Sequence, residues 1–295
     1  MSFRSVGIIT ALHRQNALEA ARALVAFLEA RFIVVKTDRA CAGQLRRPDL
    51  GAAREQLAAM DLVVVLGGDG TVLGAARDTA PHGTPLLAVD LGTFGFLSEV
   101  KAENLHPALE CVLRGEFRLE ERHMVQATIV RDGREIASST GLNDAVITRG
   151  ALSRMIRLQA FINGQYVALY PADGIIVATP TGSTAYSLSA GGPIIHPSVN
   201  VLILTPICPH TLFTRPLIIS ASEEVRIVAH WHQQHADGEE VMLTVDGQVG
   251  IWLHPGDEVV VRQADHPARL VKLGRDTFYE RLREKLQWGG EGFKG

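Results

Sequence analysis

The N-terminal part of the chain alternates short apolar runs with longer segments whose apolar residues recur at helical spacing. The short runs are rich in Val, Ile and Leu, which is typical of strands buried on both faces of a parallel sheet. The longer segments are rich in Ala and Leu, which favour helix. The pattern predicts strands at Val6–Thr10, Phe32–Val35, Leu62–Leu66 and Leu86–Asp90, and helices at Ala17–Arg31, Ala52–Met60, Val72–Asp78 and Asn104–Arg114. Alternating strands and helices indicate an α/β fold with a parallel sheet and helices on both faces.

The pattern changes near Phe117, where helical spacing gives way to short alternating runs and Asx-Gly turns. Such turns between alternating runs indicate antiparallel sheet. The expected strands are Met124–Val130, Ile136–Ser139, Ile156–Ile162, Tyr166–Tyr170, Ile175–Ala178, Val225–His230, Val241–Val245, Gly250–Leu253 and Glu258–Arg262, with turns at Asp132-Gly133 and Asn163-Gly164. We therefore expect an α/β domain over residues 1–120 and a β-rich domain over 121–270. A helix at Thr277–Leu286 within a C-terminal segment, 271–295, would pack back on the first domain.

Composition narrows the class of partner. The chain has 295 residues, 46% of them hydrophobic and 21% charged, and a formal net charge of -3 without a Lys/Arg cluster. Nucleic acid and an anionic membrane surface are therefore disfavoured as partners. The three cysteines are far apart, which indicates free thiols in a reducing cytoplasm rather than a disulfide framework or a zinc site. The N-terminus runs into a strand without a signal-peptide pattern, so we expect a cytoplasmic location.

A glycine turn follows the predicted strand Leu62–Leu66, in the order Gly67, Gly68, Asp69, Gly70 and Thr71. Glycines between a strand and a helix expose backbone N–H groups that suit phosphate, and Thr71 is a candidate cap for the helix. Asp69 is repulsive to phosphate, so it must bind a cation, accept a hydrogen bond from a substrate hydroxyl, or form the turn. Turn former and active-site residue are equally good interpretations at this point. The P-loop and dinucleotide fingerprints are both absent.

A second glycine turn, Gly92–Gly95, follows the predicted strand Leu86–Asp90. Ligands of parallel sheets bind outside the carboxyl ends of the strands. We therefore expect both glycine turns to lie at that edge of the sheet.

Three further groups of residues could carry chemistry. The stretch Asp173–Pro197 is rich in hydroxyl groups around Tyr186, which suits stacking on a base, although a buried polar loop, such as one at a subunit contact, fits slightly better. Asn143-Asp144, after an expected turn at Thr140-Gly141, could bridge two sugar hydroxyls or form an Asx turn. The arginines Arg149, Arg154 and Arg157 could meet phosphate, but lone arginines are usually solvated. The histidines His230, His232 and His235 have metal-like spacing but fit an exposed hairpin tip better.

Taken together, these residues resemble one family. Gly67–Thr71, Leu142–Asp144, Thr179–Ile194 and Val245–Gln248 are similar to motifs of the bacterial NAD kinases, in the same order and spacing along nearly the whole chain. The first motif alone also occurs in diacylglycerol-type lipid kinases, whereas the long Thr179–Ile194 run is highly specific.

The resemblance implies an α/β domain and a mainly antiparallel β domain, with the active site between them and completed by a neighbouring subunit of a homodimer or homotetramer. It implies phosphorylation of the 2′-hydroxyl of the adenosine ribose of NAD, giving NADP. ATP or polyphosphate would be the donor and a divalent metal ion, Mg²⁺, the cofactor, with unknown protein ligands.

The resemblance also implies roles for individual residues. Asp69 would be the base, and Gly67, Gly68, Gly70 and Thr71 would form the phosphate-donor loop. The implied NAD contacts are Asp69, Gly70, Asn143, Asp144, Arg154, Asp173, Thr184, Ala185, Tyr186, Ser187, Leu188, Ser189 and Gln248. The chain departs from the family at Pro171, where some members have arginine, and at Asp144, where Glu is common.

Two other functions stay open on the residues alone. A lipid kinase could use the same glycine turn, but it would want a hydrophobic entrance or a basic patch, and the polar Thr181–Ser189 stretch argues against it. A dinucleotide-binding regulator without catalysis would not need Asp69.

Overall fold

The computed structural model describes residues 3–14, 16–92, 95–150, 155–231, 241–274 and 278–288. The chain divides into two compact units. Unit 1 comprises Met1–Glu121 and Ala268–Gly295, and unit 2 comprises Arg122–Pro267. No helix among the described residues is long and apolar enough to cross a membrane.

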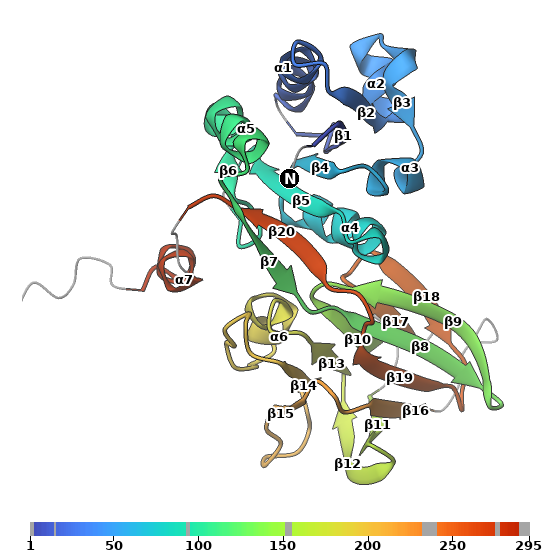
Figure 1. Cartoon of the computed structure of the whole chain (residues 1–295). Helices are drawn as coiled ribbons and strands as arrows, with labels where there is room; N and C mark the ends of the chain where they lie inside the picture. Colours follow the sequence, from blue (N-terminus) through green and yellow to red (C-terminus); the bar gives the residue numbers. More distant parts are fainter. Residues whose placement is uncertain are drawn as a thin grey trace, which may run out of the picture. The chain divides into compact units, whose positions relative to one another are not determined.

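Unit 1 is built on an eight-stranded, mostly parallel sheet in the order β3-β2-β1-β4-β5-β20-β7, with β6 paired to β5 (Figure 1). Its strands are β1 (Ser5–Thr10), β2 (Val34–Asp38), β3 (Gly51–Ala52), β4 (Leu62–Leu66), β5 (Pro85–Asp90), β6 (Val100–Lys101), β7 (Arg118–Arg122) and β20 (Ala268–Lys272). Every residue of β4 and β5 is buried, as their apolar runs predict. The predicted mostly parallel α/β sheet is therefore confirmed.

Helices cover both faces of this sheet. The α-helices are α1 (Ala17–Glu29), α2 (Arg39–Leu45), α3 (Arg54–Ala58), α4 (Asp69–Thr79), α5 (Leu105–Arg114) and α7 (Phe278–Leu286), and the 3₁₀ turns are η1 (Pro48–Leu50), η2 (Ala80–His82) and η3 (Ala102–Asn104). The helices α1, α2 and α5 share a hydrophobic core with one face. On the other face, α3 packs closely against β1. A Cβ at Gly7 of β1 would lie only 3.1 Å from the carbonyl oxygen of Leu57 in α3.

Unit 1 differs from the sequence prediction at the start of the second strand and in the presence of one further helix. The second strand starts at Val34 rather than Phe32, because Phe32 has a positive φ of 59° and is 96% exposed in the turn after α1. The helix α2 was not predicted. Its N-cap is Asp38, whose carboxylate accepts a hydrogen bond from the N–H of Cys41.

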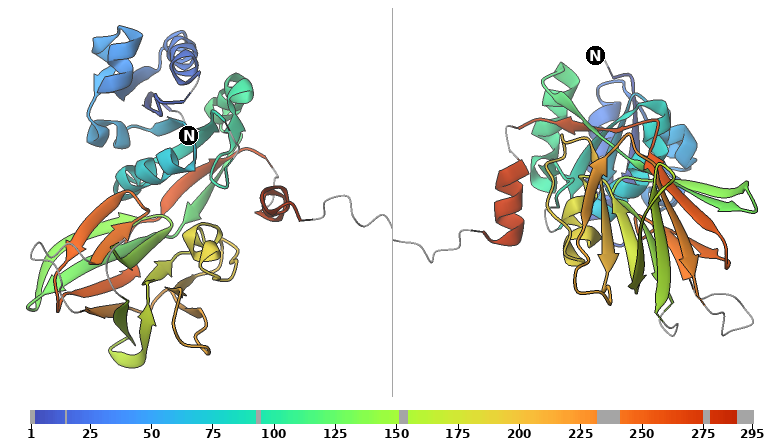
Figure 2. Two further views of the ribbon diagram at one scale, coloured as in Figure 1. Left: turned by 180° about the vertical axis from the view of Figure 1, so that it is seen from behind. Right: turned by 90° about the horizontal axis from the view of Figure 1, so that it is seen from below.

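Unit 2 consists of two six-stranded antiparallel sheets, in the orders β15-β14-β13-β10-β17-β18 and β12-β11-β16-β19-β8-β9. Figure 1 labels these strands, and Figure 2 shows them from two further sides. Its strands are β8 (Val125–Arg131), β9 (Arg134–Gly141), β10 (Asp144–Arg149), β11 (Ile156–Ile162), β12 (Gln165–Ala172), β13 (Gly174–Ala178), β14 (Val201–Ile207), β15 (Leu217–Ser220), β16 (Val225–His230), β17 (Val241–Val245), β18 (Val249–Leu253) and β19 (Glu258–Gln263). Short helices η4 (Gly182–Thr184) and α6 (Tyr186–Ser189) follow β13. The antiparallel β prediction is confirmed.

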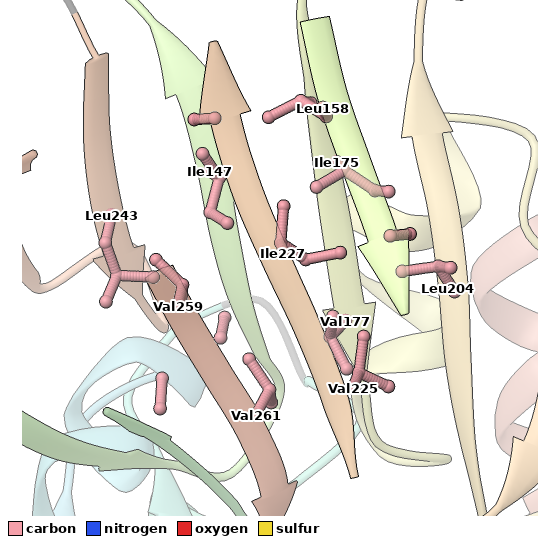
Figure 3. Close-up of a cluster of buried hydrophobic side chains, with 14 of the residues drawn as sticks. Ile147, Leu158, Ile175, Val177, Leu204, Val225, Ile227, Leu243, Val259 and Val261 are labelled. Carbon is pink, nitrogen blue, oxygen red and sulfur yellow. The ribbon is translucent and has the colours of Figure 1, made fainter. Parts of the chain in front are cut away.

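The core of unit 2 lies between the two sheets. Ile147, Ile175 and Leu243 of one sheet face Leu158, Ile227 and Val259 of the other (Figure 3). The turn residues Asp132-Gly133 and Asn163-Gly164 all have positive φ, which matches the hairpin turns that the sequence predicts.

Ile227 tests this core. It is fully buried between the sheets, so Ile227→Ala removes apolar contacts and leaves a cavity. We expect the free energy of unfolding to fall by about 2–5 kcal/mol, measured by denaturant unfolding.

Val228, the next residue on β16, is half-buried on the opposite face and provides the control. Val228→Ala should cost clearly less. Equal losses for the two variants would contradict the proposed core.

Candidate active site

The glycine turn joins β4 to α4 and differs in one respect from the expectation. The helix begins at Asp69, and its N-cap is Gly68, not Thr71. The carbonyl oxygen of Gly68 accepts hydrogen bonds from the N–H groups of Thr71 and Val72, at 2.9 and 3.2 Å, which places Thr71 inside the first helical turn. The hydroxyl of Thr71 lies 2.6 Å from where a Cβ of Gly67 would be, so a side chain at Gly67 would displace it.

The carboxylate of Asp69 is held by the two residues that follow the second glycine turn. Its Oδ2 accepts a hydrogen bond from the N–H of Phe96 at 2.9 Å, and its Oδ1 accepts one from the N–H of Leu97 at 3.2 Å. A Cβ on Gly95 would lie 1.9 Å from Oδ1, so only glycine permits this approach. The expectation that both glycine turns share the carboxyl edge of the sheet is confirmed. Asp69 is half-buried, with both oxygens oriented by backbone.

Arg14, which the sequence reasoning missed, lies beside both glycine turns. A Cβ on Gly68 would be 3.4 Å from its Nη2, and one on Gly92 would be 3.5 Å from its Nη1. The side chain is exposed, and the described part of the chain gives it no ion pair. The only signal in the sequence that could have identified Arg14 is its position as a basic residue soon after the first strand. Arg14 adds a positive charge to the edge where the amides of α4 begin.

In unit 2, the carboxylate of Asp246 organises the Asn143-Asp144 pair. Oδ1 accepts hydrogen bonds from the N–H groups of Asn143 and Asp144, at 2.8 and 3.2 Å, and Oδ2 accepts one from Leu142 at 2.9 Å. The expected turn at Thr140-Gly141 is wrong. The strand β9 continues through Gly141, which pairs with Val125.

The Thr179–Ser189 segment packs directly against the same pair. The hydroxyl of Thr179 donates to the carbonyl oxygen of Leu142 at 2.6 Å, and its N–H donates to that of Asn143 at 2.8 Å. A Cβ on Gly182 would lie 2.1 Å from the Asn143 carbonyl oxygen, so glycine is required for the contact. The structure therefore brings together three of the predicted groups within unit 2: Asn143-Asp144, the 179–189 segment and the hairpin that carries Gln248.

The hydroxyl-rich segment divides into structural and exposed residues. Ser187 is fully buried and shares a hydrogen bond with Thr205 at 3.0 Å, so its side chain serves the fold. Tyr186 is 45% exposed. Thr184, Ala185 and Leu188 are half-buried, and Ser189 is exposed. Tyr186 thus has the accessibility that stacking on a ligand requires.

Asp173 lies apart from these groups. It precedes β13, whereas Asp144 pairs with Ala178 at the other end of that strand. At about 3.3 Å per residue, five residues of strand separate them by roughly 17 Å. Asp173 forms an ion pair with Arg149, whose Nε lies 2.7 Å from Oδ1. Arg154, predicted beside it, is outside the described residues.

The described residues include no group of three or more His, Cys, Asp or Glu that could hold a metal ion. His230 lies 3.3 Å from the side-chain oxygen of Gln159, and His232 and His235 are outside the described residues.

Burial, together with the neighbouring Asp246, raises the pKa of Asp144 to about 7. The carboxyl of Asp144 therefore changes charge near neutral pH.

Comparison with known proteins agrees with both units. Residues 6–117 match a family model described as the ATP-NAD kinase N-terminal domain, and residues 142–273 match the ATP-NAD kinase C-terminal domain. The chain is 48% identical to an NAD kinase of Moorella thermoacetica, over 97% of this chain and 90% of that protein. It is 45% identical to an NAD kinase of Heliobacterium modesticaldum, over 97% and 99%.

Solved structures also resemble the chain. Yeast NADH kinase complexed with NADH superimposes with a TM-score of 0.89 at 27% identity, over 98% of this chain and 89% of that one. An NAD kinase from Archaeoglobus fulgidus in complex with ATP shares the fold, with a TM-score of 0.73 at 23% identity, over 96% and 98%.

The titration of Asp144 makes a prediction about stability. An unfolded Asp has a pKa near 3.9, so between about pH 4 and pH 7 the folded protein holds a proton that the unfolded chain has lost. Folding is therefore progressively disfavoured as pH rises through this window. Asp144→Asn should remove the effect, so the substitution should stabilise the free protein more at pH 8 than at pH 5, by up to about 3 kcal/mol.

Urea unfolding of both proteins at the two pH values measures this difference. A stability gap that is the same at pH 5 and pH 8 would show that Asp144 does not titrate in this range.

Proposed function

The chain belongs to the NAD kinase family and transfers phosphate from ATP to NAD to give NADP, and we propose that Asp69 is its catalytic base. The observation that supports this role is the fixed position of the Asp69 carboxylate at the carboxyl edge of the parallel sheet, where the N–H groups of Phe96 and Leu97 hold it. A carboxylate that cannot rotate freely can meet one substrate hydroxyl in one orientation.

The acceptor is the 2′-hydroxyl of the adenosine ribose. Asp69 takes the hydroxyl proton as the oxygen forms a bond to the terminal phosphorus of ATP, while the bond from that phosphorus to the bridging oxygen breaks and ADP leaves. Phosphoryl transfer depends mainly on positioning and charge neutralisation. General-base assistance of this kind is worth about two to four orders of magnitude in rate.

Backbone amides and Arg14 would hold the phosphate donor. The turn Gly67–Thr71 places amides at the start of α4, and the Arg14 guanidinium adjoins Gly68 and Gly92. A magnesium ion binds phosphates with few protein carboxylates, which fits the absence of a three-ligand cluster among the described residues. When bound with ATP it would offset the phosphate charges. Polyphosphate presents the same chemistry and is the alternative donor.

Residues of unit 2 would hold NAD. Asn143 and Asp144 offer an amide and a carboxyl group to ribose and nicotinamide, and Tyr186 offers an exposed ring. Ala185 and Leu188 would contribute apolar contact, Thr184 and Ser189 hydroxyl groups, and Gln248 an exposed amide from the β17–β18 hairpin. Gly70 is exposed beside Asp69.

A second copy of the chain would complete the site. Asp173 lies roughly 17 Å along β13 from Asp144, which is too far for both side chains to touch the same ribose or nicotinamide group. We therefore assign Asp173, and Arg154 with it, to the site of a neighbouring subunit in a homodimer or homotetramer. A cytoplasmic location fits the supply of ATP and the three free cysteines.

The base assignment predicts the behaviour of Asp69→Asn. The amide keeps the shape of the side chain but cannot take the proton, so turnover should fall by at least about two to four orders of magnitude while NAD still binds. NADP formation from NAD, ATP and magnesium measures turnover, and calorimetry measures NAD binding. Turnover within tenfold of the unaltered protein would exclude this role.

The shared site predicts complementation. Asp69→Asn and Asp173→Asn should each be nearly inactive alone, because each spoils every site of its own oligomer. One of the two sites of a mixed dimer carries neither substitution, so the isolated mixed dimer should regain roughly half of the normal activity. Co-expression of two differently tagged Asp69→Asn chains is the matched control. No recovery in the isolated mixed oligomer would place Asp173 in the same site as Asp69 of its own chain.

A further inference from the structure

Only two residues of α7, Arg281 and Leu282, are buried. Arg281 is 7% exposed, which is unusual for a charged side chain and requires partners. Beside this helix, Glu284 lines a cavity of about 540 Å³ together with Pro107 and Cys111 of α5. The attachment of α7 to unit 1 therefore rests on few side chains, and Arg281 is the charged one among them.

The partners of Arg281 lie in the segment that holds Asp69. Its Nη1 donates to the carbonyl oxygens of Phe96 and Ser98, at 3.1 and 2.5 Å, and its Nη2 donates to Glu99 at 2.8 Å. The guanidinium is thus hydrogen-bonded to one side of residues 96–99. On the other side, the N–H groups of Phe96 and Leu97 donate to the carboxylate of Asp69.

One peptide group connects the two sides. The carbonyl of Phe96, which accepts from Arg281, and the N–H of Leu97, which donates to Asp69, belong to the same amide. A cation at the carbonyl polarises that amide and strengthens its N–H as a donor, because hydrogen bonds in a chain reinforce one another. The contact therefore orients Asp69 and supports its negative charge.

Glu99 fixes Arg281 in turn. Its carboxylate accepts from Lys272 at 2.9 Å and from the N–H groups of Leu273 and Gly274, at 2.9 and 3.2 Å. Its N–H donates to Ala88 of β5 at 2.8 Å. Burial alone would raise the pKa of Glu99, but Lys272 and these N–H groups lower it overall, so Glu99 is an anion. The side chains of Glu99 and Arg281 are 5% and 8% exposed, and such buried pairs are costly to break from one side.

We propose that Arg281 is a positioning residue for the reaction, acting on Asp69 through the Phe96–Leu97 peptide. The C-terminal helix, distant from Asp69 in the sequence, then controls the geometry of the base. This inference rests on the proposed role of Asp69 as the base. It predicts an effect on turnover and not on NAD binding, because the hydrogen bonds from Arg281 to Phe96, Ser98 and Glu99 lie in the segment behind the base.

The test replaces Arg281 with Gln and Lys and measures steady-state kinetics together with amide hydrogen exchange. In Arg281→Gln we expect kcat to fall about 10- to 100-fold, since misplacement of a catalytic group by about 1 Å costs this much. KM for NAD should stay within twofold, and the N–H groups of Phe96 and Leu97 should exchange faster. Arg281→Lys keeps the charge opposite Glu99 but lacks the forked donor, so it should fold and lose roughly 3- to 10-fold in kcat.

Arg269→Gln is the matched control. Arg269 lies on β20 and donates to Glu121 and to the carbonyl oxygen of Gly83, away from Asp69, so kcat and exchange at residues 96 and 97 should be unchanged. Unaltered kcat in folded Arg281→Gln, or unaltered exchange at these two amides, would overturn the proposal. High turnover in Asp69→Asn would instead overturn the base assignment, while the exchange of these amides reports on the Arg281 contact separately.

Discussion

The hydrogen bonds between the carboxylate of Asp69 and the N–H groups of Phe96 and Leu97 are the contact on which the active edge of unit 1 depends. They join the turn after β4 to the loop after β5, two strands that pair in parallel in the sheet. The contact requires glycine at position 95, because any side chain there would overlap the carboxylate. The glycine turn is thus a device for orienting one acidic side chain as well as for exposing amides.

A second constraint is electrostatic. Both substrates are anions, the chain has a net charge of -3, and Asp69 adds a negative charge at the reaction edge. The net charge therefore provides no overall attraction for these substrates, and the positive charge that balances them must be local. The amides at the start of α4, the Arg14 guanidinium and a metal ion carried with the nucleotide supply it in our proposal. Arg281 adds a further cation behind Asp69, in the protein interior, where it cannot compete for the phosphates.

The parts of the fold that the sequence predicts are those set by local pattern. The buried strand Leu62–Leu66 and the Asn163-Gly164 hairpin follow from side chains within a few residues of one another. Contacts between segments far apart in the chain could not be predicted from the sequence. Ala268–Lys272 becomes a strand because β5 and β7 pair with it on either side, and Val201–Ile207 forms an interior strand although Pro206 disfavours one.

The candidate site shows the same division. The chemistry-bearing motifs could be identified because their residue types are distinctive. The residues that hold them in place could not, because Asp246 and Arg281 are ordinary charged residues until the fold brings them to their partners. Asp246 lies 102 positions from Asp144, and Arg281 lies 185 positions from Phe96. Positioning residues are invisible to local pattern for this reason.

The Asp144–Asp246 arrangement shows why this division matters for function. Asp246 is needed to fix the backbone of Asn143 and Asp144, yet its charge disfavours ionisation of the very carboxyl group that it positions. A chain selected for stability alone would place an amide at position 144. In our proposal a hydroxyl or amide of NAD hydrogen-bonds to Asp144, so bound substrate would offset a cost that the free protein bears. In our proposal, in which Asp144 contacts NAD, substrate binding and the ionisation of Asp144 are linked.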